Sequence, residues 1–263
     1  MPTNRKFSID LRALPELATE TSTSASSVRP IVGNAPALHD VLAKIGRLPP
    51  EALFLGVASD NLPVLLNLYD PHPGPMLIAG DAGSGKTAFL QAIAHSVIQT
   101  HAADDVQFGV LTNYPDEWES IESTPHRVGV FPVGNKGTQE FMQSLSSWAH
   151  SNKNTHQCVL LLVDDLESVA SLDMESVQQF RWLLLRGPTR RVWPIVTLNA
   201  PRYGQVISWL QNFRTRVFGR VANGHVAEAL GGDQASGLAQ LEPPIQFSMR
   251  EKNNWLRFWL PSC

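Results

Sequence analysis

The chain has 263 residues and a mass of 29.0 kDa, and its 21 basic and 24 acidic side chains give a formal net charge of −3. Apolar residues make up 43% and charged residues 17%, which is typical of a globular protein rather than a disordered one. The isoelectric point near 6.2 excludes a strongly basic, histone-like binder of nucleic acid, although it leaves room for a local basic patch.

Two cysteines, Cys158 and Cys263, are far apart in the sequence and form no C-x-x-C pair. This pattern indicates neither a disulfide framework nor a zinc site, and it favours a reducing, cytoplasmic location. No apolar run approaches the 18 residues of a membrane span, and no apolar segment of the secretory type follows the amino terminus.

Three segments are expected along the chain. Residues 1–30 are expected to be a flexible tail and linker, since seven of the nine residues from Thr19 to Ser27 are Ser or Thr. The apolar residues before this stretch fit either a short docking arm or a frayed terminus. Residues 31–50 are expected to hold an amphipathic helix, because apolar residues between Leu38 and Ile45 follow helical spacing. Residues 51–263 are expected to form one α/β domain.

Short apolar runs alternate with helical patterns from residue 51 onward, which predicts a mainly parallel sheet covered by helices on both faces. The first two and last two strands have short connections, so we expect antiparallel additions at the sheet edges. The predicted strands are Ala52–Ala58, Val64–Leu68, Met76–Ala79, Val106–Thr112, Val128–Phe131, Val159–Asp164, Pro194–Leu198, Thr215–Val221, Ile245–Met249 and Trp255–Leu260. The predicted helices are Lys86–Thr100, Thr138–Asn152, Met174–Arg186, Gln205–Asn212 and His225–Leu230.

A phosphate-binding loop follows the third predicted strand and leads into a helix. Its pattern G-x-x-x-x-G-K-[ST] allows successive backbone N–H groups to point at a phosphate, whereas a glycine-rich turn without a ligand explains the context less well. Lys86 is expected to contact the β- and γ-phosphates of ATP, and the Thr87 hydroxyl to hold Mg²⁺. The expected nucleotide-binding residues are Gly80, Asp81, Ala82, Gly83, Ser84, Gly85, Lys86, Thr87 and Ala88.

Two carboxylates end the aliphatic strand at Asp164 and Asp165. Asp164 is in the place of the acid that completes a Mg²⁺ site, although an apolar strand ending in Asp is common. Asp165 is either the base that polarises the attacking water or the N-cap of a following helix.

A third polar strand end follows at Thr197 and Asn199. A strand of this kind is expected between the loop strand and the acidic strand, where Thr197 or Asn199 would lie near the γ-phosphate; an ordinary strand end is the alternative. The nearest match to the guanine-reading N-K-x-D motif, Asn135-Lys136-Gly137-Thr138, lacks the acid, so ATP is expected rather than GTP.

The stretch from Ala52 to Leu260 resembles the FtsK–HerA group of RecA-like ring ATPases, which includes DNA translocases and the ATPase domains of type VII secretion. The cues are the two strands before the phosphate loop, Thr197 at the Thr of an Ala-Thr-Gln-Arg-Pro motif, and two later segments. These segments are Thr215-Arg216-Val217-Phe218 and Glu228-Ala229-Leu230-Gly231-Gly232-Asp233. The resemblance implies a three-layer α-β-α fold of the additional-strand class, ATP hydrolysis with Mg²⁺, and self-association into a ring, expected to be a hexamer.

The sequence departs from this group at the catalytic positions. Asp165 replaces the usual Glu, and Leu198-Asn199 replaces Gln-Arg. A carboxylate shortened by one methylene displaces its oxygen by about 1 Å, which can cost on the order of a hundredfold in rate. Hydrolysis is therefore expected to be slow or to use Glu167, and Asp165→Glu is expected not to lower turnover.

Eight arginines and no acidic residue lie between Arg181 and Arg220, a charge of +8 that leaves −11 on the rest of the chain. Arg214 or Arg216 could reach the γ-phosphate of a neighbouring subunit, and others could follow a nucleic-acid backbone. Alternatively, they pair with the acidic remainder of the fold or of a neighbour.

Two functions remain open from the sequence. One is a ring-forming ATPase motor that acts on DNA and relies on a partner protein for targeting, since no DNA-reading winged helix is recognisable. The other is a nucleotide-gated assembly module with weak turnover that acts on a protein partner. A nucleotide kinase is not favoured, because no arginine-rich lid follows the loop at short range.

Overall fold

A computed structural model describes residues 35–263 except 122, 153–155, 171, 234–235 and 252–253. The predicted tail of residues 1–30, with its docking arm, lies outside the described residues. Among the residues described, no helix is both long and apolar enough to cross a membrane.

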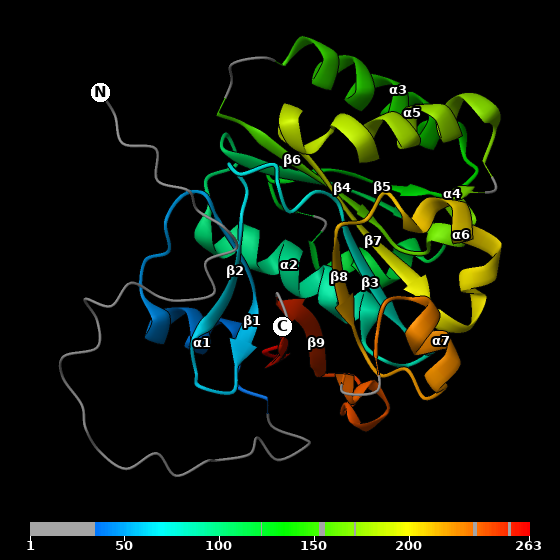
Figure 1. The fold of residues 1–263 in the computed structure, drawn as a ribbon. Helices are drawn as coiled ribbons and strands as arrows, with labels where there is room; N and C mark the ends of the chain where they lie inside the picture. Colours follow the sequence, from blue (N-terminus) through cyan, green and yellow to red (C-terminus); the bar gives the residue numbers. More distant parts are fainter. Residues whose placement is uncertain (1–34, 122, 153–155, 171, 234–235, 252–253) are drawn as a thin grey trace, which may run out of the picture.

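A single ten-stranded sheet, in the order β2-β1-β10-β9-β8-β3-β7-β6-β4-β5, forms the centre of the fold (Figure 1). Its strands are β1 (Ala52–Ala58), β2 (Pro63–Asn67), β3 (Met76–Gly80), β4 (Val106–Thr112), β5 (Arg127–Pro132), β6 (Cys158–Val163), β7 (Val192–Asn199), β8 (Thr215–Phe218), β9 (Gln246–Glu251) and β10 (Asn254–Trp259). The α-helices are α1 (Leu38–Ile45), α2 (Lys86–Thr100), α3 (Lys136–Ser151), α4 (Leu166–Ala170), α5 (Met174–Arg186), α6 (Ile207–Leu210) and α7 (Gly224–Ala229). Shorter 3₁₀ helices include η2 (Pro115–Ile121) and η4 (Ala200–Val206).

The parallel and antiparallel parts of the sheet occupy separate sides. Strands β8, β3, β7, β6, β4 and β5 are parallel neighbours. Strands β2, β1, β10 and β9 are antiparallel and join this part where β9 pairs with β8. The predicted mainly parallel sheet with antiparallel edge strands is confirmed, and all four added strands lie on the same side.

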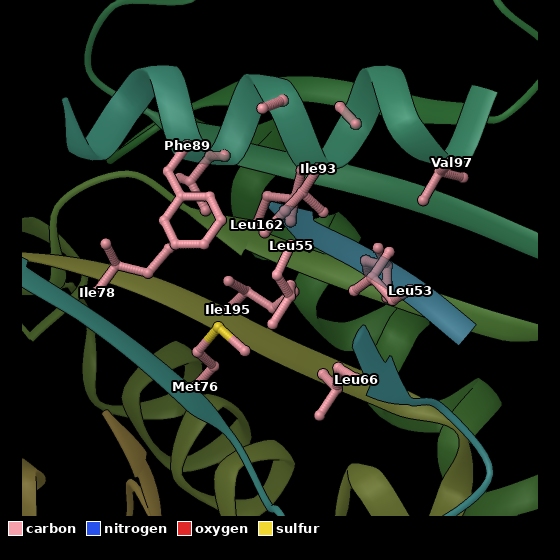
Figure 2. Close-up of a cluster of buried hydrophobic side chains, with 14 of the residues drawn as sticks. Leu53, Leu55, Leu66, Met76, Ile78, Phe89, Ile93, Val97, Leu162 and Ile195 are labelled. Carbon is pink, nitrogen blue, oxygen red and sulfur yellow. The ribbon is translucent and has the colours of Figure 1, made fainter. Parts of the chain in front are cut away.

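Side chains alternate between two apolar layers because neighbouring residues of a strand point to opposite faces. In β3, Met76 and Ile78 face helix α2, whereas Leu77 and Ala79 face the layer that contains α3 and α5. Figure 2 shows the first layer, in which Phe89 and Ile93 of α2 lie against the strands. Each fully buried side chain of this size stabilises the fold by about 1.5–3 kcal/mol. Helices cover both faces of the sheet, so the predicted three-layer arrangement is confirmed.

The carboxyl end of the described chain holds its first described residues in place. The Leu38 N–H donates to the Ser262 carbonyl oxygen at 2.8 Å, and the Ser262 N–H donates to the Pro36 carbonyl oxygen at 3.0 Å. These contacts place the apolar face of α1, formed by Leu38, Val41 and Leu42, against Phe54 of β1.

Short elements differ most from the prediction. Helix α6 is four residues long rather than eight, and β8 ends at Phe218 rather than at Val221. The sequence analysis also missed η2, whose Trp118 and Ile121 are buried three residues apart, the period of a 3₁₀ helix.

Candidate nucleotide-binding site

The predicted phosphate loop lies at the carboxyl edge of the parallel strands, between β3 and α2. Two of its glycines are required by close contacts. A Cβ at Gly80 would collide with the Ser84 hydroxyl, and a Cβ at Gly85 would collide with the Pro244 carbonyl oxygen. Gly85 also has a φ of +89°, which L side chains rarely adopt. The loop is therefore tightly packed on its outer side, while Ala82, Gly83 and Ala88 are exposed.

Asp81 ties the loop to the chain that follows β8. Its N–H donates to the Arg220 carbonyl oxygen at 2.8 Å, and its carboxylate accepts from the Ala222 N–H at 2.8 Å. Gly219 packs against Ser84 on the same side. The Gly219 N–H still donates to the Ala79 carbonyl oxygen of β3 at 2.9 Å. Beyond it, Arg220 and Ala222 bond to Asp81 instead of continuing the predicted strand.

Lys86 extends over the loop toward the acidic residues of the site. Its ammonium group donates to the Asp81 carbonyl oxygen at 2.8 Å. Burial lowers the pKa of Lys86, and the negative charges of Asp164 and Glu167 oppose this shift. A half-buried lysine ammonium with one backbone partner retains two donors for a phosphate.

Thr87 and Asp164 meet although they are 77 residues apart in the sequence. The Thr87 hydroxyl donates to the Asp164 carboxylate at 3.0 and 3.2 Å. Burial raises the pKa of Asp164, whereas hydrogen bonds from Thr197 and Thr87 lower it. A hydroxyl beside a carboxylate is a donor set that suits Mg²⁺. Among the described residues no group of three or more His, Cys, Asp or Glu forms a metal site, so a metal ion here would need further oxygen ligands from nucleotide and water.

Thr197 connects Asp164 to Asp165. Strand β7 lies between β3 and β6, as predicted, so Thr197 is beside the acidic strand end. The Thr197 hydroxyl donates to Asp164 Oδ1 at 2.9 Å and accepts from the Asp165 N–H at 2.8 Å. Asp165 has a φ of +96°, a conformation that short polar residues tolerate better than others. Its carboxylate accepts from the Ser168 hydroxyl at 3.1 Å.

Glu167 is buried beside Asp165, with 7% of its surface exposed. Burial and a hydrogen bond with the Asp165 carboxylate raise the pKa of Glu167 to about 8, whereas the positive charge of Arg202 lowers it. Glu167 therefore carries a proton near neutral pH.

Asn199 lies opposite Gly80 in the β3–β7 pair, next to the loop. Its side-chain oxygen and the Ser84 hydroxyl are both buried and have no hydrogen-bond partner among the described residues. Buried polar atoms are normally satisfied, so these two atoms indicate a polar ligand or water at the loop.

The eight arginines of the basic window do not form one cluster. The Arg216 guanidinium donates to the carbonyl oxygens of Leu230, Leu210 and Phe213 at 2.7, 2.8 and 3.4 Å, and burial lowers its pKa. Arg214 is exposed just before β8, at the edge of the sheet opposite the loop. Within the described part of the chain, none of the eight forms an ion pair with a carboxylate.

Sequence reasoning missed Ser168 and Asn113. Asn113 follows the last residue of β4 and donates to Ser168, which lies in the short helix α4. A polar residue at the carboxyl end of a strand beside β6 was the available signal for Asn113.

Comparisons with known proteins agree with this geometry. Residues 53–150 match the model of the FtsK/SpoIIIE family, which confirms the predicted resemblance to the FtsK group. No curated protein matches the sequence significantly.

Solved structures show the same fold at low sequence identity. ATPases 2 and 3 of Thermomonospora curvata EccC, in complex with a signal sequence peptide, are 15% identical, with a TM-score of 0.71 over 90% of this chain and 44% of that chain. ATPases 2 and 3 of Geobacillus thermodenitrificans EssC are 13% identical, with a TM-score of 0.70 over 90% of this chain and 48% of that chain. The pCW3 conjugation coupling protein TcpA, as a monomer with ATPγS, is 14% identical, with a TM-score of 0.64 over 87% of this chain and 70% of that chain. The chain thus spans about half the length of the EccC and EssC chains.

Proposed function

We propose that this FtsK/SpoIIIE-type P-loop ATPase binds and hydrolyses ATP as one subunit of a ring. The observation that carries the proposal is the contact between Thr87 and Asp164, which joins the phosphate loop to the acidic strand end at 3.0 Å. Two distant sequence motifs meet here in the arrangement that a Mg²⁺-nucleotide requires.

Each residue of the site has a distinct role in this proposal. Bound Mg²⁺ would offset the phosphate charge, and Thr87 and Asp164 are the residues that would hold it. Lys86 and the backbone N–H groups of residues 83–87 bind the phosphates. Thr197 fixes Asp164 and Asp165 relative to each other. Asn199, with its unpartnered side-chain oxygen beside Gly80, is the candidate for sensing the γ-phosphate.

Asp165 is the proposed acceptor for the proton of the attacking water. Glu167 is mostly protonated near neutral pH because its pKa is raised to about 8, so Asp165 remains the available acceptor. Only one of the two candidate bases is then available, on a side chain one methylene shorter than the glutamate usual in the FtsK group. Slow turnover is therefore expected, which favours the nucleotide-gated assembly module as the second candidate function.

Arg214 is the better candidate for a contact with the nucleotide of a neighbouring subunit. It is exposed, whereas the Arg216 guanidinium already holds three carbonyl oxygens of its own chain. Either DNA or a protein is the proposed substrate, since the similar structures include a conjugation coupling protein and an ATPase in complex with a signal sequence peptide.

ATP binding and phosphate release by the full chain test the proposal. Lys86→Ala should abolish turnover or weaken ATP binding by at least tenfold, and Lys44→Ala, which changes an exposed lysine of α1, should change neither. Stimulation by double-stranded DNA supports the motor, whereas tight binding with negligible turnover in both conditions supports the assembly module. Binding that is equal in wild type and Lys86→Ala would contradict both.

Light scattering with and without a non-hydrolysable ATP analogue tests the ring. A nucleotide-dependent increase in mass to a closed oligomer is expected, and Arg214→Ala should lower turnover without preventing nucleotide binding. A monomer under all conditions would contradict the role of Arg214 in a neighbouring site.

A further inference from the structure

We propose that Asn113 and Ser168 form a hydrogen-bonded relay that fixes the Asp165 carboxylate in position for hydrolysis. The inference rests on the proposed ATPase function and adds two positioning residues to it. They come from different elements: Asn113 follows β4, Ser168 lies in α4, and Asp165 lies between β6 and α4.

The chemistry of the three groups fixes the direction of the relay. The Asn113 amide nitrogen can only donate, and it lies 2.6 Å from the Ser168 hydroxyl oxygen. That hydroxyl has one proton, which it donates to Asp165 Oδ2 at 3.1 Å. Because each bond polarises the next, donation from Asn113 strengthens the bond that Ser168 makes to the carboxylate.

Asp165 is thereby held at both its backbone and its side chain. Its N–H donates to the Thr197 hydroxyl at 2.8 Å, and its backbone adopts a φ of +96°. A residue in such a conformation persists where its surroundings determine it, as at sites that require preorganisation. The relay fixes one carboxylate oxygen, Oδ2, and thus the orientation in which the carboxylate meets water.

The relay also explains why the acid is short. A glutamate at position 165 would move its carboxylate by about 1 Å, out of register with Ser168. It would also bring a longer side chain into the positive-φ conformation. The relay therefore predicts that Asp165→Glu lowers turnover, whereas the sequence alone led us to expect that it would not.

Steady-state ATP hydrolysis by the full chain tests the relay. Ser168→Ala should lower kcat about tenfold, since misplacement by 1 Å can cost a hundredfold and the Thr197 contact remains. KM and ATP binding should change less than about twofold, because neither residue belongs to the phosphate loop. Asn113→Ala should lower kcat less, and Ser168→Thr, which keeps the hydroxyl, should restore it. Ser147→Ala, an exposed serine of α3, is the matched control.

A double-mutant cycle separates positioning from general damage to the fold. In an Asp165→Asn background, Ser168→Ala should have no further effect on kcat, because the relay acts through the Asp165 carboxylate. An equal loss in both backgrounds, or a kcat for Ser168→Ala within twofold of wild type, would overturn the proposal.

The side-chain amide of Asn113 gives a readout that does not depend on hydrolysis. Its ¹⁵N–¹H resonances in the nucleotide-free protein should shift on Ser168→Ala and on Asp165→Asn, and they should stay in place on Ser147→Ala. A protein that binds ATP without hydrolysing it would contradict the proposed hydrolysis and favour the assembly module, and the Asn113 resonances would then decide the relay alone. Resonances unmoved by Ser168→Ala would overturn it.

Discussion

Replacing Glu167 with glutamine should make the protein more stable at neutral and mildly alkaline pH. Glu167 is buried beside Asp165, and burial is the main reason that its pKa is raised from an ordinary value of 4.5 to about 8. Glutamine has nearly the same shape and keeps an N–H donor for Asp165, but it cannot ionise. The substitution therefore removes the ionisation of Glu167 while it preserves the packing.

The pKa shift determines both the sign and the size of the effect. Between pH 4.5 and 8 the folded state binds a proton at Glu167 that the unfolded state has lost, so stability falls as pH rises. Each pH unit in this window costs about 1.4 kcal/mol, which amounts to about 3 kcal/mol between pH 5 and 7. The loss is complete above the folded-state pKa, and it is absent below pH 4.5.

Urea unfolding of the nucleotide-free, EDTA-treated protein at pH 5, 6, 7 and 8.5 measures this effect. The free energy of unfolding of Glu167→Gln minus that of wild type should rise with pH and level off above pH 8. Glu119→Gln, which changes an exposed carboxylate of η2, is the matched control for removing a glutamate charge. A difference that is independent of pH, or that falls as pH rises, would refute the reasoning.

Three further substitutions probe the framework of the site. Gly85→Ala should destabilise the protein by at least 1–2 kcal/mol, because it adds a Cβ at positive φ against Pro244. Thermal unfolding measures this loss, with Gly204→Ala, at a position with open space, as the control. Equal losses of stability in the two variants would contradict the prediction. Thr197→Val should cost about 2–3 kcal/mol in urea unfolding, since it removes the hydroxyl that bridges Asp164 and Asp165; a loss below 0.5 kcal/mol would exclude the bridge as a stabilising contact. Arg216→Met should cost about 2–3 kcal/mol because it removes the donor to the Leu230 and Phe213 carbonyl oxygens and one of two donors to Leu210. Full stability in that variant would show that the guanidinium is free to act elsewhere.

The sequence was sufficient to predict all ten strands and the layer structure. The strands are short apolar runs bounded by turns, and the continuous apolar runs of β3 and β6 indicate strands that are buried on both faces. The phosphate loop was predictable because its chemistry depends on residues that are contiguous in sequence. The position of β7 between the loop strand and the acidic strand was expected from its polar carboxyl end and its place after the acidic strand, and it is confirmed.

Contacts between distant segments were not predictable from local patterns. Beyond Gly219, the chain that follows β8 bonds to Asp81, through the Arg220 carbonyl oxygen and the Ala222 N–H, and the local sequence does not reveal these partners. The hydrogen bonds from Arg216 to three carbonyl oxygens could not be predicted either, because an arginine in the basic window was expected to be a surface charge. Ser168 acquires its role only because α4 brings it back to Asp165.

The hydrogen bonds that join the two ends of the described chain set an order for its folding during synthesis. The Ser262 hydroxyl donates to the Ala35 carbonyl oxygen across 227 positions, and the neighbouring backbone bonds fix α1. Residues 76–222, which contain the phosphate loop and its carboxylates, leave the ribosome well before Ser262 does. Helix α1 therefore gains this anchor only after the loop strand, the acidic strand and Pro244, which packs against the loop, have all been synthesised.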